Sequence, residues 1–391
     1  MFDYLVIGKG MIGSAAARYL SAQSASVALV GPDEPQNWRT HDGVFSSHYD
    51  QGRITRILGP ELVWSQLAKR AMAAYADIER QSGVRFHHAV GGVRANVSAE
   101  TSAKIRQIGE ELGAAFAVIS AENLNQQHPY FAFPTSTHLM LEHGLAGYIN
   151  PRSLVAAQIA IAKQQGANVI TETVTSLSQK HNYVEVATDA GATYQAKKAL
   201  ICAGAYTNML LPDKPLAVRR KAHMVLRAEI NSAEQARLAK MPTLIYELPA
   251  GSAMRSLYML PPVQYPDGRV YIKLGGTTHW PDRIFSDWQE IVAWFQSDGD
   301  PQEAEALRSV LHQTLPNLKV ERYLTKPCIL TYTEHGNAIV DQINDHLYVA
   351  AGGCGSAAKS SDAIGELAAR CVQGQAWPNE FKRTDFQAVY A

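Results

Sequence analysis

The sequence has few cysteines, and their arrangement excludes two kinds of cysteine site. Its 391 residues include only Cys202, Cys328, Cys354 and Cys371, and no two of them form a C-x-x-C pair. Cysteines scattered in this way indicate neither a disulfide framework nor a zinc site. We therefore expect no metal in this protein.

The sequence also lacks an excess of charge of either sign. Lysine and arginine total 36, aspartate and glutamate total 36, and the formal net charge is zero, so no overall charge favours nucleic acid or an anionic membrane. No apolar run approaches the roughly 20 residues of a membrane span. No basic leader precedes the apolar segment that begins at Phe2. These absences predict a soluble, cytoplasmic protein without a membrane or nucleic-acid partner.

The composition is that of a globular protein with more than one domain. Hydrophobic residues make up 46% of the 391 residues, enough for a sizeable core, and about 150 residues per domain gives two or three domains. Helices and strands are expected to alternate along much of the chain. The predicted helices include 60–82, 99–113, 151–165, 288–295 and 302–314; the predicted strands include 84–97, 184–187, 193–194, 198–202, 222–228, 256–260 and 269–274.

The most informative segment is a glycine-rich turn near the N-terminus. The apolar strand Phe2–Ile7 leads into Gly8-Lys9-Gly10-Met11-Ile12-Gly13, an Ala-rich helix and a second apolar strand, 26–30. G-x-G-x-x-G framed by strand, helix and strand is typical of a site for a dinucleotide pyrophosphate. Gly8 permits the tight turn, Gly10 lets the backbone approach the phosphates, and Gly13 lets helix and strand pack closely. The helix N-terminus supplies N–H groups for the anion.

A second turn of this kind occurs near the C-terminus. The apolar strand 346–351 enters Gly352-Gly353-Cys354-Gly355, and a helix follows through Ile364 to Cys371. Dinucleotide-type geometry is thus expected at both ends of the chain. The simplest account is a discontinuous nucleotide-binding domain with a second domain inserted into it.

Several of these segments together resemble one family, the FAD-dependent amine oxidases of the D-amino acid oxidase superfamily. Within it they resemble the branch of monomeric sarcosine oxidases and N-methyl amino acid oxidases. The resemblance covers most of the chain and is carried by 8–13, 52–56, 201–206, 271–275, and 326–341 with 349–361.

The resemblance implies an α/β fold with two parts. One is a discontinuous Rossmann-like FAD-binding domain of the glutathione-reductase type, formed by residues 1–85, 147–215 and 325–391. The other is a substrate domain of α+β type with a mixed or antiparallel sheet, formed by residues 86–146 and 216–324. The implied cofactor is FAD and not NAD. The residues implied to bind it are Gly8, Gly10, Met11, Ile12, Gly13, Ser46, Arg53, Val174, Ala203, Gly204, Cys328, Gly352, Gly353, Cys354, Gly355 and Lys359.

Cys328 matches the cysteine that holds the flavin through an 8α-thioether in sarcosine oxidase. A lone cysteine is more often a small buried hydrophobic residue, but the matching position favours a covalent link. Cys354, in the second glycine turn, is the less favoured alternative for the attachment.

Two arginines follow Gly52, and their spacing of three would place both guanidinium groups on one side of a helical turn. A solvated basic patch is the ordinary interpretation of such a pair. The resemblance instead implies that Arg56 binds the substrate carboxylate and that Arg53 lies near the flavin, and a planar fork of donors suits a carboxylate.

Two lysines have a similar choice of interpretation. Lys359 opens a helix, where its charge opposes the helix dipole, and the resemblance makes it the second partner of the substrate carboxylate instead of a surface lysine. Lys273 shares one strand face with Tyr271, while Val270, Ile272 and Leu274 share the other. By pattern alone Lys273 would be solvated; the resemblance implies that it faces the flavin and activates oxygen.

Tyr258 matches a tyrosine of the substrate pocket, but other positions depart from the family pattern. Gly31 stands where the family has the acidic residue that holds the ribose, so Asp33 or Glu34 would have to reach back. Two pocket residues of the sarcosine oxidase branch are also replaced, a tyrosine by Leu330 and a histidine by Thr277, with His279 close by. These departures predict an amine other than sarcosine, and a bulkier one.

The expected activity is oxidation of a secondary or N-methylated amino acid to an imine, with O2 reduced to hydrogen peroxide. Arg56 and Lys359 would hold the carboxylate, and Lys273, Arg53 and Tyr258 would complete the catalytic set. The alternatives are a dehydrogenase of the same fold that passes electrons to a quinone or carrier protein, and a non-catalytic flavoprotein subunit. A monomer is expected, although partner subunits stay open.

Overall fold

The N-terminal glycine turn connects strand β1 (Phe2–Ile7) to helix α1 (Met11–Ser21), and β2 (Val27–Val30) follows. This β-α-β unit was predicted and is confirmed in the computed structural model of the chain, which describes residues 1–24 and 26–391. β1 pairs in parallel with β2 on one side and with β12 on the other. β12, from the middle of the sequence, also pairs with β21 near the C-terminus. One sheet therefore contains strands from both ends and from the middle of the chain.

This first sheet has a parallel centre and a covered face on each side. Its strands run in the order β10-β11-β12-β1-β2-β9, with β21 beside β12 and β20 beside β21. One hydrophobic core lies between the sheet and a layer of helices, and another lies under β10, β11 and the 3-10 helix η1. The remaining members are β9 (Asn168–Ile170), β10 (Val174–Gln179), β11 (Val184–Thr188), β12 (Thr193–Ile201), β20 (Ile339–Gln342), β21 (Leu347–Ala351) and η1 (Gly204–Leu210).

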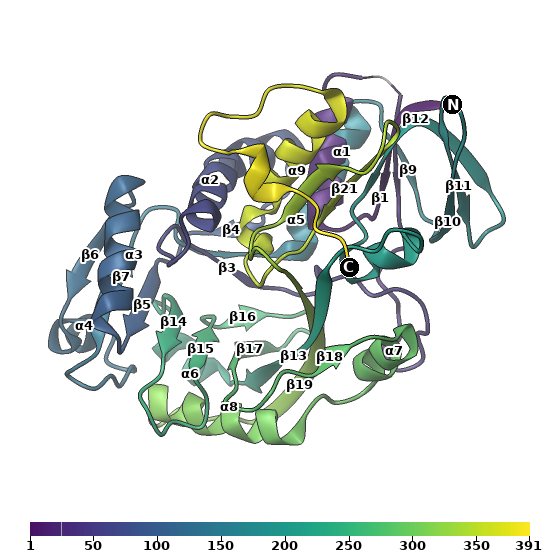
Figure 1. Ribbon diagram of the computed structural model, residues 1–391. Coiled ribbons are helices and arrows are strands. Elements are labelled where there is room, and N and C mark those ends of the chain that lie inside the picture. Colours follow the sequence, from purple (N-terminus) through teal and green to yellow (C-terminus); the bar gives the residue numbers. More distant parts are fainter. Residues whose placement is uncertain (25) are drawn as a thin grey trace.

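The helix layer joins the two ends of the chain. In Figure 1 the purple α1 and the yellow α9 (Ala357–Gln373) lie side by side in the upper part of the molecule. They pack so closely that a Cβ on Gly365 would lie 2.5 Å from the Cβ of Ala15. The layer also holds α2 (Leu62–Ser82) and α5 (Pro151–Gln164), whose predicted N-cap Asn150 accepts a hydrogen bond from the backbone of Ser153.

A small three-stranded sheet corrects one prediction. It contains β3 (Arg53–Thr55), β8 (Gly147–Ile149) and β4 (His87–His88), with β8 in the middle. Arg53 and Arg56 therefore do not lie on a helical turn. Because successive side chains of extended backbone alternate between faces, a spacing of three separates the two guanidinium groups instead of bringing them together.

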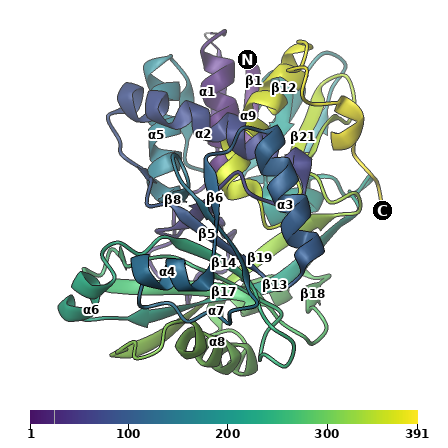
Figure 2. The same cartoon turned by 90° about the vertical axis from the view of Figure 1, so that its left-hand side faces the viewer.

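The second sheet is mostly antiparallel and forms the lower part of Figures 1 and 2. Its strands run β18-β13-β17-β15-β14-β5-β7-β6, with β19 beside β13 and β16 beside β17. β13 and β19 pair along their whole length, from Val218 opposite Thr333 to Glu229 opposite Arg322. Its strands are β5 (Gly92–Asn96), β6 (Phe116–Ile119), β7 (His138–Glu142), β13 (Val218–Glu229), β14 (Thr243–Glu247), β15 (Ser256–Met259), β16 (Val263–Gln264), β17 (Val270–Thr277), β18 (Ile284–Phe285) and β19 (Arg322–Thr333).

The two faces of this sheet differ in what they contact. One face carries alternate apolar residues such as Leu226, Met259 and Leu274, which form a core with Leu307 and Leu311 of α8 (Pro301–Thr314). The residues between them point to the opposite face, which lies toward the first sheet in Figure 1. We call this the cleft face. The paired residues that share it include His223 with Cys328, Arg227 with Lys273, Tyr258 with Gly275, Ile245 with Arg94, and Gly92 with Glu142.

The predicted domain boundaries stay a prediction, although the strands divide between two large sheets. Among the described residues, no helix is both long and apolar enough to cross a membrane. The remaining elements are α3 (Ala99–Glu111), α4 (Ala121–Gln127), α6 (Ser232–Arg237), α7 (Trp288–Gln296) and η2 (Arg383–Phe386).

Candidate functional site

A cavity of about 510 Å³ runs from the N-terminal glycine turn to strand β19. Its walls come from distant parts of the sequence, including residues 43–50 and 202–206. Most residues predicted to bind the cofactor line it, namely Gly8, Gly10, Met11, Ile12, Ser46, Arg53, Val174, Ala203, Gly204, Cys328, Gly352 and Gly353. Four others do not: Gly13, Cys354, Gly355 and Lys359.

The glycine turn has the geometry that an anion requires. Gly8 has φ +107°, and a Cβ there would lie 2.3 Å from the carbonyl oxygen of Cys202. A Cβ on Gly13 would lie 1.9 Å from the oxygen of Gly8, so Gly13 serves the packing of helix against turn. Gly10 is the N-cap of α1 and supplies no side chain to cap it. The first N–H groups of the helix can therefore bind a pyrophosphate.

The end of β2 explains why no acidic residue stands at position 31. A Cβ on Gly31 would lie 2.7 Å from the backbone nitrogen of Lys9 and 2.8 Å from its Cβ, so any side chain there would displace the turn. Neither proposed substitute lines the cavity. Asp33 is paired with Lys9, and Glu34 with Arg152 through contacts of 2.6 and 2.5 Å. Both carboxylates are thus paired with basic side chains and lie outside the cavity lining.

The two candidate attachment cysteines differ in position. Cys328 lines the cavity and is half-buried. Cys354 has φ +45°, and its Sγ lies 3.6 Å from the hydroxyl of Thr333, outside the cavity lining. All four cysteines are free thiols in the structure. The geometry favours Cys328 over Cys354, and the covalent link stays a prediction.

Lys273 lies at the centre of a buried polar cluster and not in solvent. Its side chain is fully buried, and its Nζ donates to the Asp50 carboxylate and, at 2.7 Å, to the carbonyl oxygen of Gly52. Asp50 is also paired with Arg53 and accepts a hydrogen bond of 2.8 Å from the hydroxyl of Tyr265. Asp50 and Arg53 both line the cavity, so this cluster connects Lys273 to the cofactor site.

Charge and burial compete at Lys273. Burial lowers the pKa of its ammonium group, and the positive charge of Arg53 acts in the same direction. The Asp50 carboxylate opposes both because it stabilises the charged form. The contact with Asp50 therefore favours the charged form of Lys273 against both of these effects.

Tyr258 is half-buried beside Gly275, whose Cβ, if present, would lie 2.4 Å from the tyrosine hydroxyl. That hydroxyl is hydrogen-bonded to Nε2 of His223, 3.0 Å away. Burial lowers the pKa of His223 to about 3, so the ring is neutral at ordinary pH. His279, by contrast, is exposed and bonds the carbonyl of Ser252. His223, and not His279, is the histidine at this tyrosine.

Arg56 and Lys359 lie on the other side of the cleft. Arg56 donates to the carbonyl of Leu58, and Lys359 is only 5% exposed, with its Nζ 5.8 Å from the ring centre of Trp64. Their charges act on Glu142, whose carboxylate accepts hydrogen bonds from the backbones of Ile57 and Leu58. Burial lowers the pKa of Lys359, and the nearby Arg56 lowers it further. The two cations therefore lie close together.

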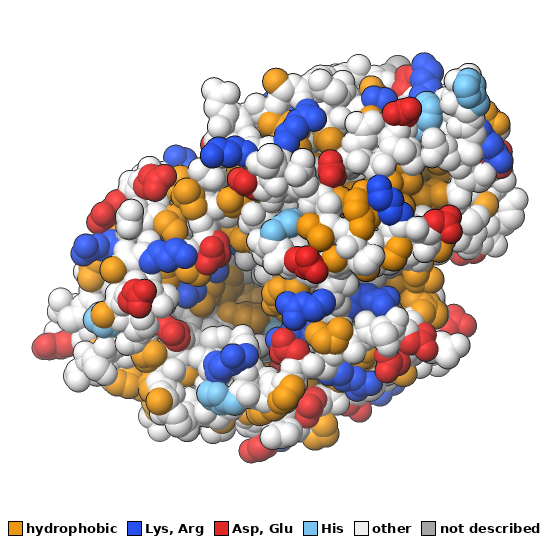
Figure 3. Space-filling model, viewed as in Figure 1, with side chains coloured by type: hydrophobic (Ala, Val, Ile, Leu, Met, Phe, Trp, Pro, Cys, Tyr) orange, Lys and Arg blue, Asp and Glu red, His pale blue; other side chains and the backbone are white. Residues whose placement is uncertain are grey.

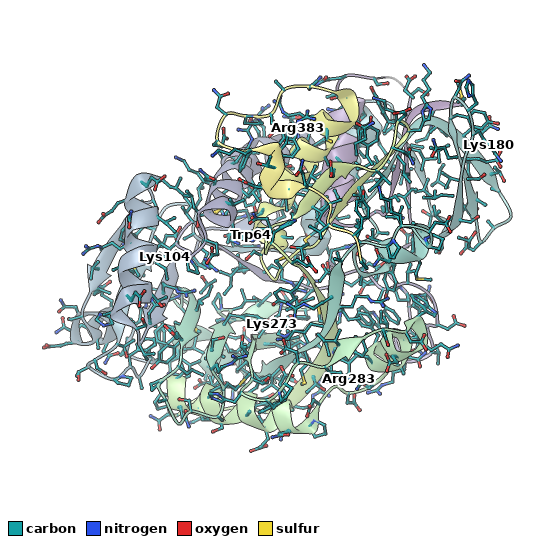
Figure 4. The ribbon with its side chains drawn as sticks, in the orientation of Figure 1. Trp64, Lys104, Lys180, Lys273, Arg283 and Arg383 are labelled. Atoms are coloured by element: carbon teal, nitrogen blue, oxygen red, sulfur yellow. The ribbon has the colours of Figure 1, made fainter. Side chains whose placement is uncertain are left out.

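The figures show where these groups face each other. Figure 4 places Trp64 in the upper part of the molecule and Lys273 on the sheet below it. Figure 3 shows a hollow in the surface between the two parts, with hydrophobic and basic side chains around it. The cleft face of the sheet thus looks toward α2 and the start of α9.

Several residues of this site were not identified from the sequence. Asp50 stands three residues before Arg53, and that spacing in a polar loop was the available signal. The sequence contains no such signal for Glu142, His223 or Lys326. An isolated polar residue in a predicted strand is ordinarily solvent-exposed, so none of the three was expected to be part of the site. Lys326 lines the cavity, donates to the carbonyl of Tyr49, and lies 3.8 Å from the ring centre of Trp38.

The residues present fit a flavin dinucleotide. The open N-terminus of α1 suits its pyrophosphate, and the cavity continues from there to Cys328 and the Asp50 cluster. The roles of the single residues stay predictions.

Comparison with known proteins identifies the family to which this sequence belongs. A family model described as FAD dependent oxidoreductase (DAO) matches residues 3–371. A monomeric sarcosine oxidase from Bacillus sp. is 24% identical over 380 residues, covering 94% of this chain and 90% of the relative. An N-methyl-L-tryptophan oxidase from Escherichia coli is 23% identical over 392 residues, covering 99% and 98%.

A similar solved structure is that of NikD, described as an unusual amino acid oxidase essential for nikkomycin biosynthesis. It aligns with a TM-score of 0.78 at 19% identity, covering 100% of this chain and 98% of that one. At this identity the similarity shows a shared fold.

Proposed function

Since this chain belongs to the FAD dependent oxidoreductase (DAO) family, we propose that it oxidises a secondary or N-methylated amino acid, or a related carboxylated amine, to an imine. The protein is an FAD-dependent oxidoreductase that acts on CH–NH bonds, like its relatives sarcosine oxidase and N-methyl-L-tryptophan oxidase. The substrate and the electron acceptor are the parts of this function that require a test.

The observation that carries the proposal is the pair of cations Arg56 and Lys359. In the described part of the chain, neither has a carboxylate oxygen within the 4.0 Å of an ion pair. Buried charges without a partner are costly, and a carboxylate ligand would supply the partner. Arg56 can offer two parallel N–H donors to it, and Lys359 a single one.

The other residues of the cleft face would act on the rest of the substrate. Tyr258 presents a hydroxyl whose orientation is fixed by His223, and this hydroxyl can accept a hydrogen bond from the substrate amine. FAD, when bound, supplies the two-electron acceptor for the C–H bond that is broken. The protein supplies position, a closed site and fixed charges.

We also propose that O2 is the acceptor and hydrogen peroxide the product. Support comes from the buried Lys273, whose Nζ donates to the Asp50 carboxylate; in its protonated form it would stabilise negative charge on reduced oxygen. A dehydrogenase that passes its electrons to a quinone or carrier protein would not need this charge, although it would share the fold.

The test begins with anaerobic reduction of the purified holoenzyme by a panel of N-methyl and cyclic amino acids. Bleaching of the flavin by such amines, and stoichiometric hydrogen peroxide on admission of air, is expected. Arg56→Gln and Lys359→Gln should each raise the KM of the best amine at least about tenfold. Lys104→Gln, on an exposed surface, is the control. A flavin that no carboxylated amine reduces would refute the substrate class, and reduction without peroxide would favour the dehydrogenase.

A further inference from the structure

Arg94 of β5 lies on the cleft face, in line with the groups already described. It stands opposite Ile245 of β14, and Ile245 stands opposite Tyr258 of β15. Arg94 is thus two strands from Tyr258, on the order of 10 Å between Cα atoms. Its neighbours Val93 and Ala95 point the other way, into the core shared with α8. The register therefore directs the Arg94 side chain toward the space where Tyr258 and Lys273 also point.

The bonding of Arg94 is incomplete. Its Nε donates to Oδ1 of Asn96 at 3.0 Å, and no other side-chain hydrogen bond of Arg94 occurs among residues 1–24 and 26–391. In that same part of the chain no carboxylate lies within 4.0 Å of its guanidinium group. Glu247, the carboxylate whose charge acts on it most, has an Oε2 atom that is buried and without a partner. Four of the five N–H groups of Arg94 thus have no hydrogen-bond partner in the described part of the chain.

Arg94 also lies close to the predicted carboxylate site. Burial lowers its pKa to about 9, and the next cause is the positive charge of Arg56. The charge of Arg56 therefore acts on both Arg94 and Lys359 at this end of the cleft, and none of the three has an ion-pair partner among residues 1–24 and 26–391. A single carboxylate bound between Arg56 and Lys359 leaves Arg94 without an ion-pair partner, because Glu247 acts on it only from beyond 4.0 Å.

We propose that Arg94 is a second anion-binding group of the substrate site, so that the amine oxidised here carries two acidic groups. One carboxylate lies between Arg56 and Lys359, and the second, on the substrate side chain, binds Arg94. This inference rests on the proposed function, which it narrows to N-alkylated acidic amino acids and related dicarboxylic amines.

The geometry sets the length of such a substrate. Tyr258 faces the amine, and Arg94 begins on the order of 10 Å from it with a side chain about 6 Å long. A side-chain acid two or three bonds beyond the α-carbon, as in N-methylated aspartate or glutamate, can bridge this gap.

The test compares a charged substrate with its neutral isostere. N-methyl-DL-glutamate should have a kcat/KM at least about tenfold above that of N-methyl-DL-glutamine, because only the former places a charge at Arg94. Arg94→Gln should bring this ratio near one, and Arg94→Lys should restore part of it. The control Arg106→Gln lies on the exposed face of α3 and should leave the ratio at its wild-type value.

A binding measurement separates this inference from the proposed function. Glutarate and butyrate, titrated into the holoenzyme and followed by the flavin absorption spectrum, differ by one carboxylate and need no turnover. Glutarate should bind at least about tenfold more tightly, and Arg94→Gln should abolish the difference. Equal affinities, or a preference that survives Arg94→Gln, would show that Arg94 is a structural partner of Asn96 and Glu247 only. Failure of every amine to reduce the flavin would refute the oxidase proposal, while the glutarate preference would still decide the role of Arg94.

Discussion

The ammonium group of Lys273 is hydrogen-bonded to the carboxylate of Asp50, which lies 223 residues before it in the sequence. This contact joins the centre of the ten-stranded sheet to the loop that lines the cofactor cavity. Because Asp50 also pairs with Arg53 and accepts from Tyr265, its position is fixed from three sides. The Nζ atom of Lys273 is therefore held at one place beside the cofactor cavity.

Replacement of Lys273 should separate the two halves of the catalytic cycle. Lys273→Met removes the amino group that we propose stabilises reduced oxygen, so the reaction of the reduced enzyme with O2 should slow about 100-fold or more. Anaerobic reduction by the amine should change much less. Stopped-flow absorbance of each half-reaction measures both rates, and Lys104→Met is the surface control. Equal slowing of both halves would mean that Lys273 acts on substrate binding and not on oxygen.

Loss of Cys328 should release the flavin. If its thiol forms the 8α-thioether, acid-precipitated wild-type protein retains the yellow colour in the pellet, and Cys328→Ser releases it to the supernatant. Cys354→Ser should behave like wild type, because Cys354 lies outside the cavity lining. Colour that leaves the wild-type pellet would show that the flavin is not covalently bound.

Glu303 should make the protein less stable as the pH rises. It lines a second, polar cavity of about 340 Å³ with Lys221 and Asp282, and burial together with Asp300 raises its pKa from 4.5 to about 7. The folded state thus binds the proton more tightly than the unfolded state, so stability falls between about pH 4.5 and 7, by on the order of 2 kcal/mol.

Thermal unfolding from pH 5 to pH 8 checks this sign. Relative to Glu303→Gln, which has no proton to lose, the wild-type Tm should fall as the pH increases. Glu305→Gln, on the exposed side of the same helix, should follow the wild-type curve. A wild-type protein that gains stability over this range relative to Glu303→Gln would contradict the expected direction.

Local patterns predicted much of the fold. The β-α-β unit around Gly8–Gly13 depends on neighbouring residues only, and the alternation of Ile272 and Leu274 with Lys273 gave the correct face of β17. The turn at Arg53 was wrong because a spacing of three fits a helix, whereas pairing with β8 extends the chain there. Such a partner, almost 100 residues away, has no local signature.

The candidate site was predictable in part for the same reason. Residues of the glycine turns carry a motif, and most of them line the cavity. The burial of Lys273 and Lys359 is set by elements that pack on them from elsewhere, so hydrophobic pattern alone favoured solvent for both. Asp50, Glu142 and His223 were assigned to the site because of the groups to which they are hydrogen-bonded. These contacts join distant parts of the sequence and are seen only in the tertiary structure.

The alternation of faces along the second sheet has a consequence for how this enzyme can diversify. Positions on the cleft face and positions that hold the sheet on α8 alternate along each strand, and they lie on opposite sides of the backbone. A change at every second residue can therefore reshape specificity with little loss of stability. Insertion of a single residue into β13 or β17, however, would exchange the two sets and bury lysine and histidine among leucines. We therefore expect this fold to tolerate substitutions on the cleft face and not to tolerate insertions or deletions of single residues within these strands.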